Sequence, residues 1–156
     1  MSIAEIITPE RALILEDVTS KKRALEKLSD ILGEATPYVS NNEIFTALVG
    51  REKLGSTGIG DGVAIPHGRL KGADECVGAM IRLDKGIDFE ASDDAPVDIL
   101  FGLLVPQEST EEHLQILRNL AELFSDSDCL ERLRKATSGQ ELVDALLEFD
   151  QVAQSD

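Results

Sequence analysis

Two histidines are the only imidazole side chains in this chain of 156 residues, and one of them closes a glycine-rich stretch. The stretch reads GSTGIGDGVAIPH and runs from Gly55 to His67. A neutral imidazole has a pKa of about 6.5, so at pH 7 its lone pair can attack phosphorus without a separate base. The phosphorylated ring can then pass the group on, which divides one difficult transfer into two easier steps. These residue types therefore favour phosphoryl transfer, with His67 as the nucleophile.

Other kinds of site fit this stretch less well. A nucleotide P-loop needs a Gly-Lys-Ser/Thr triplet, which the chain lacks, and a dinucleotide fingerprint lies between a strand and a helix rather than after a helix. A metal site could use His67, His113 and the carboxylate of Asp61, but no paired-ligand spacing supports it. Neither Cys76 nor Cys129 lies near a histidine in sequence, and no GxSxG motif is present. We therefore expect no metal and no cofactor, and we expect both cysteines to be buried apolar residues.

Several residues near His67 could hold the oxygens of a phosphoryl group. Arg51 offers a planar guanidinium, Ser56 and Thr57 offer hydroxyls, and His113 lies in the first turn of a predicted helix whose positive end favours an anion. Glycines allow backbone amides to turn toward an anion, and the candidates are Gly58, Gly60 and Gly68. Asp61 could either raise the basicity of His67 or face solvent.

Two amphipathic helices precede the glycine stretch. The first is predicted from about Ser20 to Ala35, where apolar residues recur at three- and four-residue spacing. The second begins at Ser40, which can form a capping box with Glu43. Its apolar stripe is Ile44, Leu48 and then Arg51. Arg51 is therefore predicted on the inward face, at the end nearest the glycines.

Strands follow the glycines. Residues 63–67 read VAIPH, and Pro66 limits this strand to an edge, a bulge or an end. Residues 76–83 alternate, which predicts a strand with one face in the core. Residues 97–105 are almost continuously apolar and predict a central strand covered on both faces. Residues 86–91 are expected to add a short strand.

Three helices close the chain. The first opens with a predicted capping box of Ser109 and Glu112 and carries His113 on its apolar stripe. Shorter helices follow at 127–136 and 138–149, the latter capped by Ser138. The fold class is therefore α/β, with a small mixed β-sheet flanked by helices in a three-layer sandwich. We expect one domain over residues 3–150 and a frayed tail at 151–156.

The composition limits the partners. Fifteen Lys and Arg against thirty Asp and Glu give a net charge of −15, which repels nucleic acid and anionic membrane surfaces. No segment has the run of about 18 apolar residues that a membrane span needs, and no basic region precedes an apolar run at the N-terminus. We expect a cytoplasmic protein that binds neither nucleic acid nor membranes.

The residues from Glu52 to Gly68 resemble a known phosphohistidine signature: Glu52, six residues, Ile59-Gly60, two residues, then VAIPHG. It is the signature of the IIA domains of the bacterial phosphoenolpyruvate-dependent phosphotransferase system, fructose/mannitol type. The segments SKKRALEKLSDIL, REKLGSTGIG and VDILFGLLVPQESTEEHLQILRNLAELF are also similar to that family. The resemblance extends from the first helix to about residue 150, and it implies the fold of the mannitol/fructose IIA domains.

The resemblance also implies an activity and site residues. It implies that His67 accepts a phosphoryl group through Nε2 from a phosphohistidine on the small carrier HPr or its nitrogen-branch counterpart. It matches His113 to the family's second active-site histidine and Arg51 to its arginine, and it makes the protein a phosphotransferase component.

The branch within the family follows from two features of the resemblance. The chain resembles the nitrogen-regulatory IIA proteins in being a single free-standing domain and in its segment TSKKRALEKL. This resemblance implies downstream regulatory target proteins. Two alternatives stay open: the IIA component of a fructose/mannitol-type sugar transport system, and a regulatory interaction module that acts mainly unphosphorylated.

Overall fold

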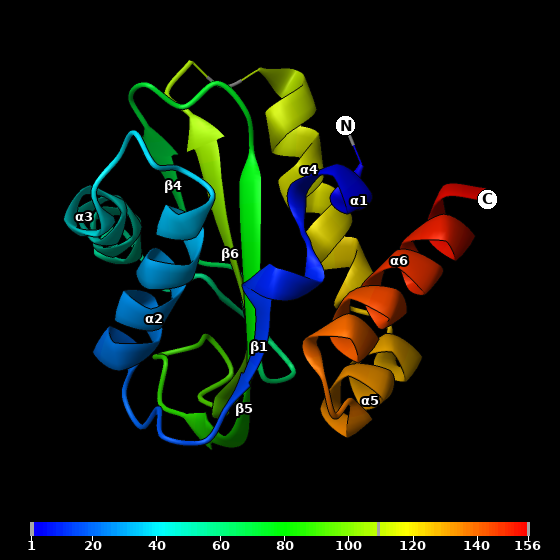
Figure 1. Cartoon of the computed structure of the whole chain (residues 1–156). Helices are drawn as coiled ribbons and strands as arrows, with labels where there is room; N and C mark the ends of the chain where they lie inside the picture. The colour runs from blue at the N-terminus through cyan, green and yellow to red at the C-terminus, as the bar shows by residue number, and fades with distance from the viewer. Residues whose placement is uncertain (1, 109, 156) are drawn as a thin grey trace.

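The computed structural model describes residues 2–108 and 110–155, which form a three-layer α/β sandwich. Helices α2 and α3 cover one face of the sheet, and α4, α5 and α6 cover the other, together with α1 (Figure 1). The predicted fold class is confirmed. In chain order the elements are α1 (Ile3–Ile6), the 3-10 helix η1 (Pro9–Arg11), β1 (Ala12–Leu15), α2 (Lys21–Glu34), α3 (Asn41–Glu52), β2 (Gly58–Gly60), β3 (Val63–Ala64), β4 (His67–Leu70), β5 (Val77–Ile87), β6 (Val97–Pro106), α4 (Glu111–Leu123), α5 (Ser127–Lys135) and α6 (Gly139–Ser155).

The sheet is mixed and six-stranded. The strand order along its main path is β1-β5-β6-β3-β2. Strands β3 and β4 pair with the same side of β6 one after the other, β3 at residues 99–100 and β4 at residues 103–106. Strands β5 and β6 are antiparallel, whereas β6 runs parallel to both β3 and β4. The predicted central strand is confirmed, because β6 has partners on both sides and is buried along almost its whole length.

Pro66 interrupts the strand that pairs with β6. Strand β3 ends at Ala64 and β4 begins at His67, as expected of a residue that has no N–H to donate. The break stays within hydrogen-bonding reach of β6, because the Leu103 N–H donates to the Pro66 carbonyl at 2.9 Å. His67 consequently opens β4 opposite Leu103, at the edge of the sheet.

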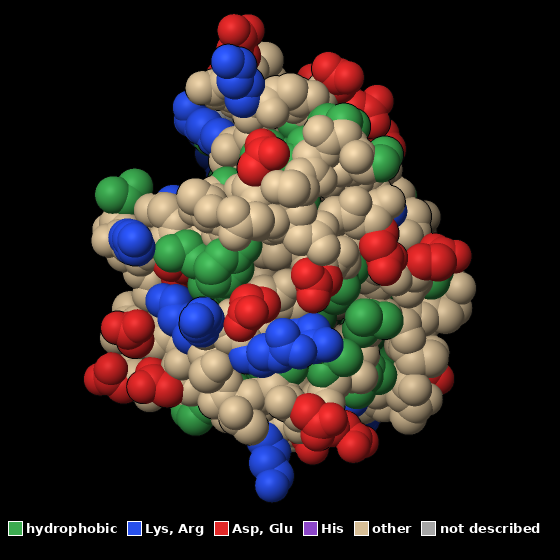
Figure 2. All heavy atoms as spheres, turned by 60° about the vertical axis from the view of Figure 1, so that its left-hand side comes forward, with side chains coloured by type: hydrophobic (Ala, Val, Ile, Leu, Met, Phe, Trp, Pro, Cys, Tyr) green, Lys and Arg blue, Asp and Glu red, His purple; other side chains and the backbone are tan. Residues whose placement is uncertain are grey.

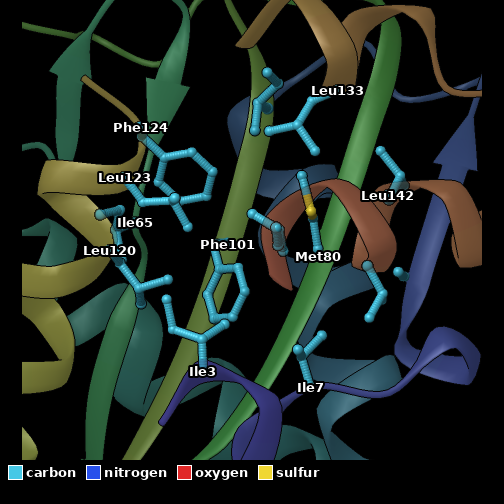
Figure 3. Packing of buried hydrophobic residues seen from close by; sticks show 14 of the residues in the cluster. Ile3, Ile7, Ile65, Met80, Phe101, Leu120, Leu123, Phe124, Leu133 and Leu142 are labelled. Atoms are coloured by element: carbon cyan, nitrogen blue, oxygen red, sulfur yellow. The ribbon is translucent and has the colours of Figure 1, made fainter. Parts of the chain in front are cut away.

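The core has two parts, one on each face of the sheet. In the part that faces α4 to α6, Phe101 and Met80 of the sheet lie among Leu120, Phe124 and Leu142 of the helices (Figure 3). The prediction that the 76–83 strand buries only one face is wrong. Alternate β5 residues enter both parts of the core, because helices cover both faces of the sheet.

Both cysteines lie in the core, as predicted. Cys76 is 4% exposed and Cys129 is fully buried. Burial raises the pKa of the Cys76 thiol to about 11 and that of Cys129 to about 12. Both side chains therefore remain protonated and unreactive at neutral pH.

The predicted helix starts before the glycines are confirmed. The Ser20 hydroxyl accepts the N–H of Arg23 at 3.1 Å, and the Ser40 hydroxyl accepts the N–H of Glu43 at 3.1 Å. Ser138 caps α6 in the same way. The capping box expected of Ser109 falls outside the described residues, and the N-cap that the structure gives α4 is Thr110.

Three segments differ from the sequence prediction. Ala12–Leu15 forms β1, which we did not predict and which pairs in parallel with β5. Residues 86–91 form no separate strand, because Gly86 and Ile87 end β5 and the next four residues form a loop. The tail expected after residue 150 is helical, since α6 continues to Ser155.

Charges of both signs share the face that carries α2 and α3. Figure 2 shows Lys and Arg side chains there among Asp and Glu side chains, with hydrophobic groups between them. The first two turns of α2 contribute four basic residues: Lys21, Lys22, Arg23 and Lys27. The net negative charge is thus unevenly distributed. Among the described residues, no helix has the length and apolar character needed to cross a membrane.

Candidate functional site

A cavity of about 350 Å³ lies where the edge strand β4 meets α3 and α4. These two helices lie on opposite faces of the sheet, with β4 between them (Figure 1). The cavity brings together Arg51 from α3, His67 and Gly68 from β4, and His113 from α4. Four candidates from three separate elements therefore share one cavity.

The ring of His67 is held in one tautomer. Its Nδ1 lies 2.8 Å from the Ile65 carbonyl oxygen. A carbonyl only accepts hydrogen bonds, so Nδ1 must carry the proton and Nε2 must carry the lone pair. The unprotonated nitrogen is thus the one that can act as a nucleophile.

The surroundings of His67 favour its neutral form. Burial of the ring lowers its pKa below the ordinary value of 6.5, and the positive charge of Arg51 lowers it further. The hydrogen bond to Ile65 and the charge of Glu52 oppose this shift without reversing it. The lone pair on Nε2 is therefore available at pH 7.

His113 is held in the opposite tautomer. The backbone N–H of Thr110 donates to His113 Nδ1 at 3.0 Å, which closes a capping box at the start of α4. Because Nδ1 accepts this bond, the neutral ring carries its proton on Nε2. His113 thus presents a hydrogen-bond donor where His67 presents a lone pair.

Arg51 ends the predicted apolar row of α3. Ile44 and Leu48 are fully buried, and one turn later the side chain of Arg51 lines the cavity. Its Nη1 donates to the Gly55 carbonyl at 2.8 Å. A guanidinium has five N–H donors, so others can bind an anion.

Gly68 allows α3 to lie against β4. A Cβ added at Gly68 would come within 3.0 Å of the Ala47 Cβ and 3.1 Å of the Ala47 carbonyl carbon. Such contacts are tighter than side chains normally make, so a larger residue would displace the helix. Gly68 therefore sets how closely Arg51 approaches the strand of His67.

The other predicted phosphoryl ligands lie elsewhere. Among the described residues that line the cavity, Ser56, Thr57, Gly58 and Gly60 do not occur. The Ser56 hydroxyl donates to the Phe89 carbonyl at 2.9 Å and accepts the Gly58 N–H at 3.1 Å. The Thr57 hydroxyl is buried and donates to Glu52. Both hydroxyls thus hold the loop together rather than face the cavity.

Asp61 belongs to a tight hairpin. Asp61 and Gly62 are the two residues between Gly60 and Val63, and both have positive φ, at 57° and 81°. Positive φ at both positions is the requirement of the type I′ turn that Asp-Gly favours. The exposed Asp61 also accepts an Arg134 hydrogen bond at its carbonyl, at 2.6 Å. Asp61 is therefore a turn residue, and the Asp-Gly dipeptide was the sequence signal for it.

Glu52 is a residue near the site whose role the sequence did not reveal. Its carboxylate is buried at the end of α3 and lies 3.0 Å from the Lys21 ammonium. It also accepts the Thr57 N–H at 3.1 Å. In the sequence, Glu52 was notable only as the first residue of the phosphohistidine signature, and the signature does not indicate which residues Glu52 contacts.

The rim of the cavity is apolar and open. Leu54 is 84% exposed, and Leu114 and Leu117 of α4 line the opposite side. An exposed apolar rim is typical of a surface that meets another protein. As for metals, the described part of the chain contains no group of three or more His, Cys, Asp or Glu placed to hold an ion.

Known proteins resemble this chain in sequence. Residues 5–149 match the family model "Phosphoenolpyruvate-dependent sugar phosphotransferase system, EIIA 2". The chain is 46% identical over 140 residues to a nitrogen regulatory protein of Pseudomonas aeruginosa, covering 90% of this chain and 91% of that protein. It is 36% identical over 151 residues to a fructose-specific EIIA component of Haloferax volcanii, covering 95% and 98%.

The fold is also that of a solved relative. The crystal structure of the nitrogen regulatory protein IIA-Ntr from Neisseria meningitidis matches with a TM-score of 0.85 and 42% identity, over 92% of this chain and 98% of that one. Family model, sequence and fold agree over nearly the whole chain. The chain therefore belongs to the EIIA 2 family of the phosphoenolpyruvate-dependent sugar phosphotransferase system.

Proposed function

We propose that this protein accepts a phosphoryl group on Nε2 of His67 from the phosphohistidine of an HPr-like carrier of the nitrogen branch, and that the phosphorylation switches a regulatory interaction. The observation that carries the proposal is the pair of tautomers in the cavity. His67 directs a lone pair from Nε2, while His113 carries a proton on the equivalent nitrogen. One ring is prepared to attack phosphorus and the other to bind an oxygen.

The transfer forms one bond and breaks another. The Nε2 lone pair of His67 bonds to phosphorus as the N–P bond of the donor breaks, and the electron pair of that bond returns to the donor imidazole. The Nδ1–H of His67 remains hydrogen-bonded to the Ile65 carbonyl, and this bond stabilises the positive charge that the ring gains. Arg51 and the Nε2–H of His113 hold the equatorial oxygens, so positioning and charge neutralisation supply most of the catalysis.

The nitrogen branch is supported by the relatives named nitrogen regulatory protein in Pseudomonas aeruginosa and Neisseria meningitidis. A bound phosphoryl group adds about two negative charges beside an exposed apolar rim, which can change which proteins bind there. The Haloferax relative supports the alternative, transfer to a sugar transport system.

The two branches are separated by one assay with two carriers. The protein is incubated with phosphoenolpyruvate, enzyme I and either the nitrogen-branch or the sugar-branch carrier, and the phosphorylated residue is located by mass spectrometry. We expect faster labelling of His67 from the nitrogen-branch carrier. Faster labelling from the sugar-branch carrier would support the sugar alternative, and absence of label on His67 with both carriers would refute phosphoryl transfer.

The rate of transfer should depend on the protonation of His67. Below its pKa the ring is protonated on both nitrogens and has no lone pair, and burial holds this pKa below 6.5. We expect the single-turnover rate to rise with pH through that pKa and to be level at neutral pH and above. The check is a pH profile with purified phospho-carrier, beside an NMR titration of the His67 ring. A pKa above 6.5 for this ring would contradict the expectation.

Replacing the second histidine should slow transfer without preventing it. His113→Ala removes one neutral hydrogen-bond donor from the phosphoryl oxygens, and we expect the rate to fall about tenfold to hundredfold. The measurement is single-turnover transfer at saturating carrier. Because His113 also closes the α4 capping box, His113→Asn serves as the matched variant that can still accept the Thr110 N–H. A wild-type rate in both variants would leave His113 with only its capping role.

A further inference from the structure

The buried carboxylate of Glu52 is fully engaged, yet it does not line the His67 cavity. Only 5% of its side chain is exposed. Oε1 lies 3.0 Å from Lys21 Nζ and accepts the Thr57 N–H at 3.1 Å, while Oε2 accepts the Thr57 hydroxyl. Burying a carboxylate is costly unless it is paired and hydrogen-bonded, and here Lys21 of α2 and Thr57 of the loop supply the partners. The contacts join the start of α2, the end of α3 and the loop before β2.

From Thr57 a series of hydrogen bonds leads to His67. The Thr57 carbonyl accepts the N–H of Ile65 at 3.0 Å, and the Ile65 carbonyl accepts the Nδ1–H of His67 at 2.8 Å. The Ile65 side chain is fixed as well, because it lies against Leu120 and Leu123 in the core (Figure 3). Thr57 thus holds the backbone N–H of Ile65, the residue whose carbonyl selects the tautomer of the nucleophile.

From the same residues a second series leads to Arg51. Glu52 and Thr57 are the two ends of a short loop, and the loop carbonyl of Gly55 accepts the Arg51 Nη1–H at 2.8 Å. Gly55 has a φ of +145° and its N–H bonds to the Glu52 carbonyl at 3.1 Å, so the loop folds back tightly on α3. Holding both ends of this loop fixes the carbonyl that orients the guanidinium.

We infer that Glu52 and Thr57 form a positioning clamp for phosphoryl transfer, one anchor that orients both the nucleophile His67 and its anion-binding partner Arg51. The inference rests on the proposed function, since it concerns the same transfer. Neither clamp residue touches the phosphoryl group. A displacement of either reacting group by about 1 Å can lower a rate about a hundredfold, so a shared anchor has a large effect on catalysis.

Glu52 also acts on His67 through its charge. The charged and titratable groups that surround His67 are Arg51 and Glu52 from α3, Arg69 from its own strand and His113 from α4. The carboxylate raises the pKa of His67, whereas Arg51 lowers it. The two clamp residues, Glu52 and Thr57, should therefore differ in their effect on the pKa of His67, because only Glu52 carries a charge.

The test compares two clamp variants with a matched control. Thr57→Val removes the buried hydroxyl and keeps the shape of the side chain, and Glu52→Gln removes the charge. Thr36→Val is the control, because Thr36 is also buried and its hydroxyl also donates a hydrogen bond, to the Leu32 carbonyl at 3.1 Å. We expect single-turnover transfer at saturating phospho-carrier to fall about tenfold to hundredfold in both clamp variants. The control should match wild type, and Thr57→Ser should recover the rate.

Two readouts separate positioning from a merely structural role. An NMR titration of the His67 ring should give a lower pKa in Glu52→Gln and an unchanged pKa in Thr57→Val. The maximal rate should fall by a larger factor than the KM for the carrier changes, because neither clamp residue lines the cavity, although the loop that they hold carries Leu54 of the apolar rim. If Thr57→Val does not fold, Glu52→Gln decides the question by the same readouts.

The outcomes are distinct. Transfer in the clamp variants at the rate of Thr36→Val, or a loss of rate that only follows thermal unfolding, would overturn the clamp. Absence of label on His67 in the wild-type protein would instead refute the proposed function, whatever the variants do.

Discussion

The variant His67→Ala should take up no phosphoryl group from the carrier. His113 cannot replace the missing nucleophile, because its Nδ1 accepts the Thr110 N–H and its Nε2 carries the proton. No other imidazole exists in the chain. We therefore expect loss of transfer to the background of the assay, measured as the acid-labile, alkali-stable phosphate characteristic of phosphohistidine and as the mass of the intact protein.

The two histidine variants together identify the nucleophile. His113→Ala should still accumulate the label, only more slowly, whereas His67→Ala should not accumulate it at any time. Circular dichroism and thermal unfolding control for the fold, since the half-buried His67 ring contributes to packing. Alkali-stable phosphate at the wild-type rate in His67→Ala would place the acceptor on another residue.

Residues with a local signal were predicted well. The starts of α2 and α3 follow from Ser20 and Ser40, because a cap acts on amides only two or three residues away. The position of Arg51 follows from helical periodicity, since Ile44 and Leu48 are buried on the same face. Neither prediction requires knowledge of the rest of the fold.

Structure that depends on distant partners was not predicted. Strand β1 exists because Ala12 to Leu15 pair with β5, nearly 70 residues later, and its short sequence has no strand signal of its own. The directions of the Ser56 and Thr57 hydroxyls depend on how the loop folds back, so composition alone could not distinguish a phosphoryl ligand from a loop contact. Helical spacing placed Arg51 near the glycines and residue type made His113 a candidate, whereas the match of both to the active site of His67 came from the resemblance.

Most glycines of the glycine-rich stretch position the site rather than line it. Gly62 takes part in the Asp-Gly turn, and a Cβ there would meet the Arg134 guanidinium at 2.5 Å and Asp98 at 2.9 Å. Arg134 in turn pairs with Asp98 at 3.0 Å, so the hairpin is fixed against α5 and β6. Of the glycines predicted to bind the phosphoryl group, only Gly68 lines the cavity. Its lack of a side chain allows α3 to pack closely against β4. A glycine-rich sequence beside a nucleophile is therefore not sufficient to indicate an anion-binding loop.

Arg51→Ala should slow transfer more than any substitution short of the nucleophile itself. Hydrogen bonds from an ionised donor are roughly twice as strong as neutral ones, and loss of one preorganised donor to a developing anion costs about a hundredfold to a thousandfold. Arg51→Lys should recover only part of the rate, because a point charge replaces a planar fork that also binds the Gly55 carbonyl. The matched control is Arg132→Ala, which removes a surface arginine paired with Glu148 on the opposite side of the sheet. If Arg51→Ala lowered the melting temperature but left single-turnover transfer at the Arg132→Ala rate, Arg51 would serve only the end of its helix.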